Sequence, residues 1–461
     1  MSAVTAAMTH SQDATGQAQA AGTDVVLGLG VTGLSCARYL TALGRRVVVF
    51  DSRETPPGLK AAAARAPAAV IQTGGLDVSL PPDTARVIVS PGLTLDLPVI
   101  AEARRRGLPV IGDIELFAEV VERPVVAITG SNGKSTVTTM LAAMAEECGR
   151  TALAGGNLGV PALDLLLEPT PDLYVLELSS FQLECTQSLR PAAAVVLNVS
   201  EDHIDRHGTL ESYAGAKARI YDRAEHAIAN REDPLVRAMI ESHPDVVTFG
   251  LDAPAPGQFG LAVDGTGRPW LARGDERLMP VDELRLPGLH NAANALAALA
   301  LGLASGFPVP PMLDALRHYK GLAHRTNRVS DRNGCAWIND SKATNVGAAV
   351  AAISGLPGTL VLIAGGDGKG ADFAPLAAAA RGRLRGAVLL GQDADAIAHA
   401  LADDCPVVKV ADMNEAVVQA AALAMPGDTV LLSPACASLD MYVNYAARGE
   451  AFIRAIGRLD E

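Results

Sequence analysis

A glycine-rich segment at residues 125–139 combines the residue types best suited to chemistry in this chain. Its sequence is Val-Val-Ala-Ile-Thr-Gly-Ser-Asn-Gly-Lys-Ser-Thr-Val-Thr-Thr, in which a β-branched run ends in a turn and a helical pattern opens at Thr136. The backbone N–H groups of such a turn and the N-terminus of the following helix face phosphate groups. We expect Lys134 to reach the outer phosphates and the Ser135 hydroxyl to bind Mg²⁺. The segment therefore predicts the use of ATP or a related nucleotide.

The spacing of this segment differs from that of the standard phosphate loop. Position 128 is Ile, and the motif runs Gly130-x-x-Gly133-Lys134-Ser135. The alternative interpretation is a glycine turn that only joins a strand to a helix. Because strand, loop, lysine and hydroxyl all follow in order, the sequence favours the nucleotide site.

An acid and a histidine follow two later apolar runs. Glu177 ends the run that starts at Leu173, the place where nucleotide hydrolases hold Mg²⁺ with an acid. The alternative role for Glu177 is a capping carboxylate. His203 follows another apolar run and is flanked by acids, which favours a metal role over a purely structural one.

Lys217 lies in the same stretch as His203, where its ammonium would repel Mg²⁺. Carbamylation would convert this side chain into an oxygen ligand, which suits a hard cation. The alternative is an ordinary surface lysine paired with Glu211 or Asp222.

The N-terminal part of the chain contains a second glycine motif. Gly28-x-Gly30-x-x-Gly33 lies between a predicted strand and a predicted helix, and Asp51 ends the next strand. This pattern is similar to a dinucleotide fingerprint. Taken alone, it is weak evidence for NAD and indicates only that a phosphate or diphosphate approaches the helix N-terminus.

Three polar loops also lie in the C-terminal third: 339–345 precedes a predicted helix, and 365–370 and 433–440 follow predicted strands. Loops at the carboxyl ends of parallel strands face one crevice. Four of their side chains suit a small substrate that carries a carboxylate: Lys342, Thr344, Lys369 and Ser438. Before these loops, Asn294 could donate to a nucleotide base, and Arg325 lies at a domain junction where it could reach a phosphate or stack on adenine. Asn291 has the plainer role of a helix cap.

Composition sets limits on the class of protein. The 461 residues carry a net charge of −13, which argues against non-specific nucleic-acid binding. The six cysteines form no C-x-x-C pair and indicate reduced thiols of a cytoplasmic enzyme. No segment predicts a membrane span, and residues 1–22 lack signal-peptide features and are expected to be disordered. Only seven of the 38 basic residues are lysines, and four of these lie in the motifs above, which favours chemical roles for them over chance.

Strand and helix signals alternate along most of the chain, which predicts an α/β fold. We expect Rossmann-like N-terminal and C-terminal units around a central P-loop ATPase-like α/β domain. The expected divisions are an extension at 1–22, an N-terminal domain at 23–120, a central domain at 121–321 and a C-terminal domain at 322–461. The Pro- and Gly-rich section at 251–288 predicts added antiparallel strands.

With these segments assembled, the chain resembles the Mur ligases of peptidoglycan synthesis. The Thr-Gly-Ser-Asn-Gly-Lys-Ser-Thr loop at 129–136 is shared across that superfamily, which includes folylpolyglutamate synthases. The match runs from about residue 24 to 460, and its details are similar to the members that add D-glutamate. Those details are the segments 28–35, 51–58, 90–92, 340–345 and 433–440.

The resemblance implies a UDP-binding, an ATP-binding and an amino-acid-binding domain, so the N-terminal glycine motif would hold a uridine nucleotide and not NAD. The implied UDP contacts are Gly30, Val31, Thr32, Asp51, Ser52, Arg53, Ser90 and Gly92. The implied ATP contacts are Gly130, Asn132, Gly133, Lys134, Ser135, Thr136, Asn294, Arg325 and Asp340. Asn157 and His203 would lie near the muramoyl-alanine end of the substrate. The implied D-glutamate contacts are Thr344, Lys369, Ser438, Leu439 and Tyr445, the last of which stands where the family pattern has Phe.

The resemblance further implies ATP and two Mg²⁺ ions as cofactors. Ser135 and Glu177 would hold one ion, and His203 and a carbamylated Lys217 the other. Lys134, His203 and Lys217 would be the catalytic residues. The implied reaction joins D-glutamate to UDP-N-acetylmuramoyl-L-alanine through an acyl phosphate, performed by a monomer. The alternatives are another ligase of the superfamily, such as folylpolyglutamate synthase, an NAD-linked dehydrogenase and a non-catalytic nucleotide switch.

Overall fold

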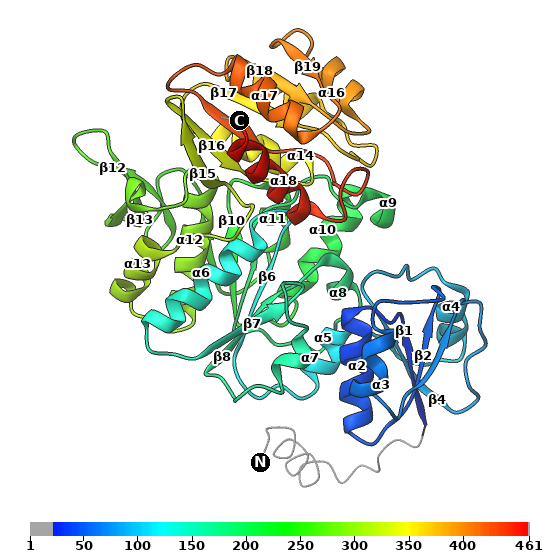
Figure 1. Ribbon diagram of the computed structural model, residues 1–461. Coiled ribbons are helices and arrows are strands. Elements are labelled where there is room, and N and C mark those ends of the chain that lie inside the picture. Colours follow the sequence, from blue (N-terminus) through cyan, green and yellow to red (C-terminus); the bar gives the residue numbers. More distant parts are fainter. Residues whose placement is uncertain (1–21, 460–461) are drawn as a thin grey trace.

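The computed structural model describes residues 22–459, and the polypeptide forms three α/β units (Figure 1). The expected disorder of the N-terminal extension concerns residues that lie almost wholly outside this described part. The three sheets are separate from one another, with five, nine and six strands. The predicted fold class is confirmed.

The N-terminal unit is a parallel sheet with strand order β3-β2-β1-β4-β5. Its elements are β1 (Thr23–Leu27), α2 (Val31–Ala42), β2 (Arg46–Asp51), α3 (Leu59–Arg65), β3 (Val70–Thr73), β4 (Thr84–Val89), α4 (Pro98–Arg105) and β5 (Val110–Ile111). The strand order reverses between β1 and β4, so the turns after these two strands lie at the switch point where such sheets bind ligands, and the end of β2 lies next to the turn after β1.

The central unit is built on a nine-stranded sheet, β14-β13-β12-β11-β10-β9-β6-β8-β7. Its first part comprises α5 (Asp113–Ala118), β6 (Val125–Thr129), α6 (Lys134–Glu147), β7 (Ala152–Gly156), α7 (Ala162–Leu165), β8 (Leu173–Glu177), α8 (Ser180–Glu184), β9 (Ala193–Val196), α9 (Ile204–His207) and α10 (Leu210–Ala218). Its second part comprises β10 (His226–Asn230), α11 (Pro234–Met239), β11 (Val246–Phe249), β12 (Phe259–Val263), β13 (Pro269–Arg273), β14 (Glu276–Pro280), α12 (Leu289–Ala304) and α13 (Val309–His318). Strands β12, β13 and β14 pair antiparallel, as the sequence predicts for this section.

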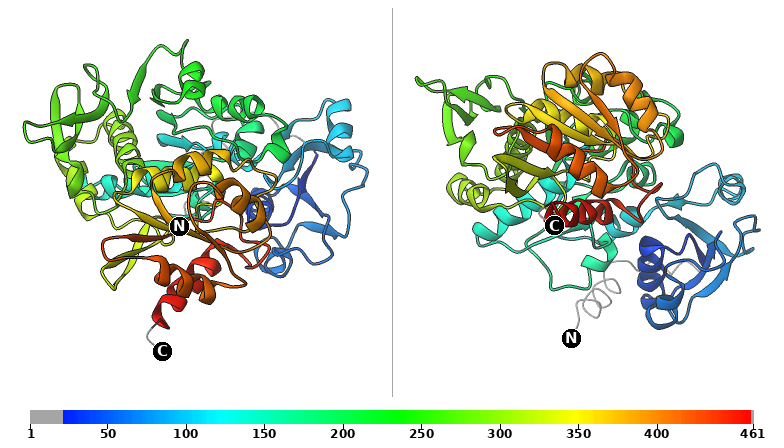
Figure 2. Two further views of the ribbon diagram at one scale, coloured as in Figure 1. Left: turned by 90° about the horizontal axis from the view of Figure 1, so that it is seen from above. Right: turned by 45° about the horizontal axis from the view of Figure 1, so that its top comes forward.

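The C-terminal unit is a six-stranded sheet, β15-β16-β20-β17-β18-β19, in which only β15 is antiparallel to its neighbour. Its elements are β15 (Asn327–Arg332), β16 (Cys335–Asn339), α14 (Val346–Gly355), β17 (Leu360–Ala364), α15 (Ala374–Ala380), β18 (Leu384–Leu389), α16 (Ala394–Leu401), β19 (Val407–Lys409), α17 (Met413–Leu423), β20 (Thr429–Leu432) and α18 (Tyr445–Gly457). Figure 2 shows this unit, in yellow to red, against the green central unit, with the blue N-terminal unit at a different side.

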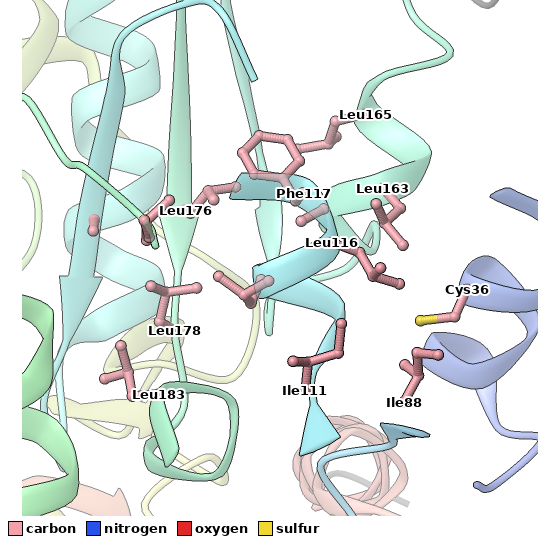
Figure 3. Close-up of a cluster of buried hydrophobic side chains, with 14 of the residues drawn as sticks. Cys36, Ile88, Ile111, Leu116, Phe117, Leu163, Leu165, Leu176, Leu178 and Leu183 are labelled. Carbon is pink, nitrogen blue, oxygen red and sulfur yellow. The ribbon is translucent and has the colours of Figure 1, made fainter. Parts of the chain in front are cut away.

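One hydrophobic cluster crosses from the N-terminal unit into the central unit (Figure 3). Cys36 and Ile88 approach it from the first sheet and its helix, and Leu116, Phe117 and Leu163 from α5 and α7. Arg38 on α2 adds an ion pair of 2.6 Å to Asp164 on α7. The buried apolar surface therefore ties these two units together.

Candidate active site

The loop at 129–136, which the sequence predicts to bind phosphate and which we call the phosphate-binding loop, joins β6 to α6, and two glycines in the left-handed region shape it. Gly133 has a φ of +85°, and a Cβ on it would lie 2.5 Å from Oδ1 of Asn294. Asn198 braces the loop, because its Oδ1 accepts from the Asn132 backbone N–H (2.8 Å) and its Nδ2 donates to the Asn132 carbonyl (3.1 Å). Asn294, which the sequence predicts to contact ATP, thus lies against the loop. The bracing role of Asn198 has no signal in the sequence.

Lys134 lies over the same loop. Its Nζ donates to the Gly130 carbonyl (2.7 Å) and the Ser131 carbonyl (2.9 Å). Burial lowers the pKa of Lys134, and the Glu177 carboxylate opposes that shift. An ammonium held among the loop carbonyls is within short reach of any phosphate that the loop binds. Thr136 is buried in the first turn of α6.

Ser135 and Glu177 meet directly. The Ser135 hydroxyl donates to Oε2 of Glu177 (2.5 Å), and Nδ2 of Asn157 donates to Oε1 (2.6 Å). Nη2 of Arg325, from the start of the C-terminal unit, donates to the Ser135 hydroxyl (2.7 Å). The geometry thus brings together the pair expected to hold Mg²⁺ and the arginine expected to contact ATP. Asn157 reaches Glu177, a contact that sequence reasoning did not anticipate.

Lys217 is buried under the loop, with 1% of its surface exposed. Its Nζ donates to the Gly130 carbonyl (2.9 Å) and lies 4.3 Å from the ring centre of Tyr213. Burial, followed by the nearby Lys134 charge, lowers the pKa of Lys217 well below its usual value. The alternative of a surface lysine paired with Glu211 or Asp222 is therefore wrong. Burial favours the neutral form of an amine. Carbon dioxide adds to that neutral form, so the environment of Lys217 suits carbamylation.

His203 lies at the start of α9 with a left-handed φ of +55°. Its ring packs edge-on to Phe181 at 5.0 Å, and Nε2 is 3.7 Å from a carboxylate oxygen of Asp202. Burial lowers the pKa of His203, and Asp202 opposes that shift. The ring is therefore favoured in its neutral form, which is the metal-binding form.

Magnesium fits the residues around the loop. Within residues 22–459 no group of three or more His, Cys, Asp and Glu side chains is placed to hold a metal ion. The hydroxyl of Ser135 and the carboxylate of Glu177 are hard oxygen donors, and Mg²⁺ is commonly bound by one or two carboxylates together with substrate phosphates. A sparse protein donor set at a phosphate loop therefore suits Mg²⁺ bound with a nucleotide.

The turn after β1 and the end of β2 form the corner of the N-terminal unit where the sequence predicts nucleotide binding. Asp51 accepts from the Leu29 backbone N–H (2.6 Å) and forms an ion pair with Arg53 (2.7 Å). The Arg53 guanidinium lowers the pKa of Asp51 to about 2. The first turn of α2 contains Val31 and Thr32, and no side chain caps that helix at Gly30, so its N–H groups are available to an anion. Ser52 is exposed beside them.

Ser90 lies at the opposite side of this corner. Its hydroxyl donates to the Gly28 carbonyl (3.3 Å), and it would be 2.9 Å from a Cβ on Gly28. Gly92 follows two residues later and has open space where a side chain would be. The two expected uridine-site segments are therefore adjacent across Gly28.

The third group of predicted residues lies on loops of the C-terminal unit. Nζ of Lys342 lies 4.2 Å from the ring centre of Tyr445, and burial lowers the pKa of Lys342 to about 8. Asp340 is buried and accepts from the Thr326 backbone N–H (3.0 Å) and the Ser433 hydroxyl (2.9 Å), and burial raises its pKa to about 6. Thr344 follows on the same loop, Lys369 has a left-handed φ of +53°, Ser438 is buried and Leu439 is exposed.

Arg448 holds these loops together, and sequence reasoning missed it. Arg448 is 2% exposed, and its guanidinium donates to the carbonyls of Ser341, Gly365, Cys436 and Ala437. It lies inside α18, where a lone arginine resembles an ordinary surface residue in sequence. Only the fold reveals that the loops with Thr344, Lys369 and Ser438 share one cation.

Comparison with known proteins places this site in a family. The N-terminal domain model of MurD-like Mur ligases matches residues 22–112, the Mur ligase middle domain 128–302, and the glutamate ligase domain of Mur ligases 324–436. A UDP-N-acetylmuramoylalanine–D-glutamate ligase of Nitrosococcus oceani is 53% identical over 442 residues, covering 95% of this chain and 97% of the relative. The chain belongs to the Mur ligase family.

Further relatives and solved structures agree with this assignment. A Pseudomonas putida ligase with the same name is 50% identical, over 94% of this chain and 97% of its own. The solved UDP-N-acetylmuramate–alanine ligase of Thermotoga maritima has a TM-score of 0.59 at 19% identity, over 95% of this chain and 99% of its own. A pseudomurein peptide ligase of Methanothermus fervidus has a TM-score of 0.60 at 19% identity, over 95% of this chain and 100% of its own. These two structures support the fold of this Mur ligase.

Proposed function

We propose that this Mur ligase uses ATP to join D-glutamate to UDP-N-acetylmuramoyl-L-alanine in peptidoglycan precursor synthesis. The observation that carries the proposal is the meeting of Lys134, Ser135, Glu177 and Arg325 at one loop, in a chain about half identical to ligases named for this reaction. The glycine turn of the N-terminal unit supports a UDP-linked substrate. The loops that Arg448 joins carry Lys342, Lys369 and Ser438, which support a small substrate that bears a carboxylate.

The chemical problem is that a carboxylate resists attack by an amine. The terminal L-alanine carboxylate attacks the γ-phosphorus of ATP, ADP leaves, and an acyl phosphate forms. The D-glutamate nitrogen, after losing a proton, then attacks the acyl carbon, and inorganic phosphate leaves with the former carboxylate oxygen. The products are the amide, ADP, phosphate and a proton.

The residues of this chain supply position and charge. The backbone of residues 130–133 and the Lys134 ammonium hold the phosphates, and Arg325 brings a second cation from the C-terminal unit. Magnesium supplies further positive charge against the phosphates when it is bound at Ser135 and Glu177. We propose that His203 orients the muramoyl-alanine end.

We also propose a second magnesium site at His203 and a carbamylated Lys217. The burial of Lys217 and the lowered pKa of its amine support the modification. The lowered pKa of His203 supports a neutral ligand.

The free state of all six cysteines supports a reducing cytoplasmic location. No helix within residues 22–459 is long and apolar enough to cross a membrane. A monomer is proposed on the completeness of the site within one chain.

The alternative of a folylpolyglutamate synthase is less well supported, because the N-terminal model that matches is specific to MurD-like ligases. The deciding experiment offers UDP-N-acetylmuramoyl-L-alanine, labelled with oxygen-18 in its carboxylate, together with ATP and either D- or L-glutamate. We expect ADP release only with D-glutamate and transfer of the label to inorganic phosphate. Release of unlabelled phosphate, or equal rates with both enantiomers, would contradict the proposal.

A further inference from the structure

Asn345 lies where the C-terminal unit meets the nucleotide site. It precedes α14, and its amide pairs with that of Asn132 in the phosphate-binding loop. Nδ2 of Asn132 donates to Oδ1 of Asn345, and Nδ2 of Asn345 donates to Oδ1 of Asn132, both at 3.3 Å. Nδ2 of Asn345 also donates to Oδ2 of Asp202 (3.0 Å). One amide therefore joins two loops of the central unit.

The same side chain also starts α14. Oδ1 of Asn345 accepts from the Ala348 backbone N–H at 2.8 Å, which is a standard helix cap. A cap alone requires only the oxygen, and Asp or Ser would supply it. The amide nitrogen, which faces Asn132 and Asp202, is the part that a cap does not explain.

The first turn of α14 packs tightly against the central unit. A Cβ on Gly347 would lie 2.6 Å from the Ser200 hydroxyl and 3.5 Å from Nδ2 of Asn132. Ser200 in turn is held to the phosphate-binding loop, because its backbone N–H donates to the Ser131 hydroxyl (3.0 Å). The backbone of the first turn of α14 therefore lies directly against the Ser200 and Asn132 side chains of the central unit.

The loop before Asn345 carries the amino-acid side of the site. Thr344 is its neighbour, and the Thr344 backbone N–H donates to the Lys342 carbonyl at 2.8 Å. A displacement of Asn345 therefore moves Thr344 and Lys342 with it. The position of these side chains depends on a contact with the loop that binds phosphate.

We infer that Asn345 is a positioning residue that couples occupation of the phosphate-binding loop to the affinity for the incoming amino acid. The inference rests on the proposed function. A bound triphosphate fixes residues 130–133, and fixed Asn132 holds Asn345 and the loop that precedes it. By linkage, the amino acid strengthens nucleotide binding by the same factor.

The test uses the full chain loaded with UDP-N-acetylmuramoyl-L-alanine. D-Glutamate binding is measured by calorimetry with and without the β,γ-imido analogue of ATP and Mg²⁺, which gives the coupling factor. In the unmodified chain we expect the analogue to strengthen D-glutamate binding by about tenfold. In Asn345→Ser, which keeps a capping oxygen, that factor should fall towards one, and KM should rise for D-glutamate more than for ATP.

Two further variants separate coupling from capping. Asn345→Asp keeps a good helix cap but places a second carboxylate against Asp202. We therefore expect Asn345→Asp to lose more D-glutamate affinity than Asn345→Ser. Asp412→Ser is the matched control, because Asp412 caps α17 in the same unit through the backbone N–H groups of Asn414 and Glu415. It should leave the coupling factor unchanged.

An unmodified coupling factor in Asn345→Ser, or an equal response of Asn345→Asp and the Asp412 control, would overturn the inference. So would a wild-type chain in which the analogue leaves D-glutamate affinity unchanged. A wild-type chain that releases no ADP with D-glutamate would instead refute the proposed function. The two failures are therefore distinguishable.

Discussion

At the scale of single residues, Glu177 is the centre of the site, because it accepts two short hydrogen bonds and faces the phosphate-binding loop. Glu177→Gln removes the charge while it keeps the shape. We expect ADP release to fall by at least about 100-fold, since loss of even an outer partner of a metal site costs up to that factor. More Mg²⁺ should be needed for half-maximal rate. A magnesium titration of both proteins tests this.

The control for that substitution is Glu168→Gln, an exposed acid on the same unit. It should behave as the unmodified chain. Unchanged magnesium dependence in Glu177→Gln would show that the carboxylate does not contribute to the ion site.

Lys217 carries the second prediction at this scale. Lys217→Ala should lose nearly all ligation, because no oxygen ligand forms at that position, and short carboxylic acids added to the assay should restore part of the rate. The exposed Lys409, which pairs with Asp395, offers the control Lys409→Ala. The measurement is ADP release against carboxylate concentration. Full activity of Lys217→Ala would refute the carbamate.

Residues inside a local motif were the ones that sequence could assign. Strand ends and glycine spacing predicted that Lys134, Ser135 and Glu177 lie at one loop, and the structure brings them together there. Asn198, Asn345 and Arg448 have no such local signal, because each acts on a segment distant in sequence. Such contacts are set by tertiary packing, which cannot be deduced from a single amino-acid sequence.

At the scale of elements, the approach of α2 to the turn after β1 depends on Gly33. A Cβ there would lie 1.8 Å from the Gly28 carbonyl oxygen. Gly33→Ala should therefore push the helix away, at a cost of about 1–3 kcal/mol or more in unfolding free energy, and weaken binding of the UDP-linked substrate. Thermal unfolding and calorimetric titration with UDP measure the two effects.

Gly75→Ala is the matched control for this substitution, since nothing lies within 4 Å of a Cβ at that position. It should leave both stability and UDP affinity nearly unchanged. Equal behaviour of the two variants would contradict the close-approach argument.

The start of α5 carries a pH-dependent prediction. Burial raises the pKa of Asp113 to about 6. In the unfolded chain the pKa of an aspartate is about 3.9. Between about pH 4 and 6 the native state therefore binds more protons than the unfolded state, and the free energy of unfolding falls as pH rises. Asp113→Asn should remove this part of the slope, so that its Tm relative to the unmodified chain rises between pH 4 and 6 and is constant above. A parallel course of the two Tm curves would contradict it.

Most elements were predictable because apolar runs and glycine turns mark them. The hairpin of β15 and β16 was missed, although Asn333-Gly334 between them is a strong hairpin signal, with both residues in the left-handed region. Its first strand, Asn-Arg-Val-Ser-Asp-Arg, is too polar to suggest a strand alone. Edge strands face solvent on more sides, and their pattern is correspondingly weak.

At the scale of the whole molecule, the two junctions between units differ in kind. The N-terminal and central units share an apolar cluster (Figure 3). Within residues 22–459, none of the apolar clusters combines residues before 320 with residues after 326. The contacts described there are polar, such as Arg325 to Ser135 and Asn345 to Asn132. Sequence predicted three units but not this asymmetry, because the contacts between units join residues that are distant in sequence.

This asymmetry predicts two unfolding transitions in calorimetry. The N-terminal and central units should unfold together, because separating them exposes apolar surface, and the C-terminal unit should unfold apart. The ATP analogue, which contacts both sides of the polar junction in the proposed site, should bring the two transitions closer. Three separate transitions would contradict the shared core.

The connection at residues 319–323 lies between α13 and β15. In the described part of the chain, the apolar clusters that contain residues before it share no residue with those that contain residues after it. A chain severed there would yield two halves that each keep an intact interior. Only the polar contacts that the structure describes at this junction, such as Arg325 to Ser135, would hold the two fragments together. Their association would therefore depend on small molecules that contact both fragments. The two fragments of such a divided enzyme would then associate mainly when the nucleotide is bound between them.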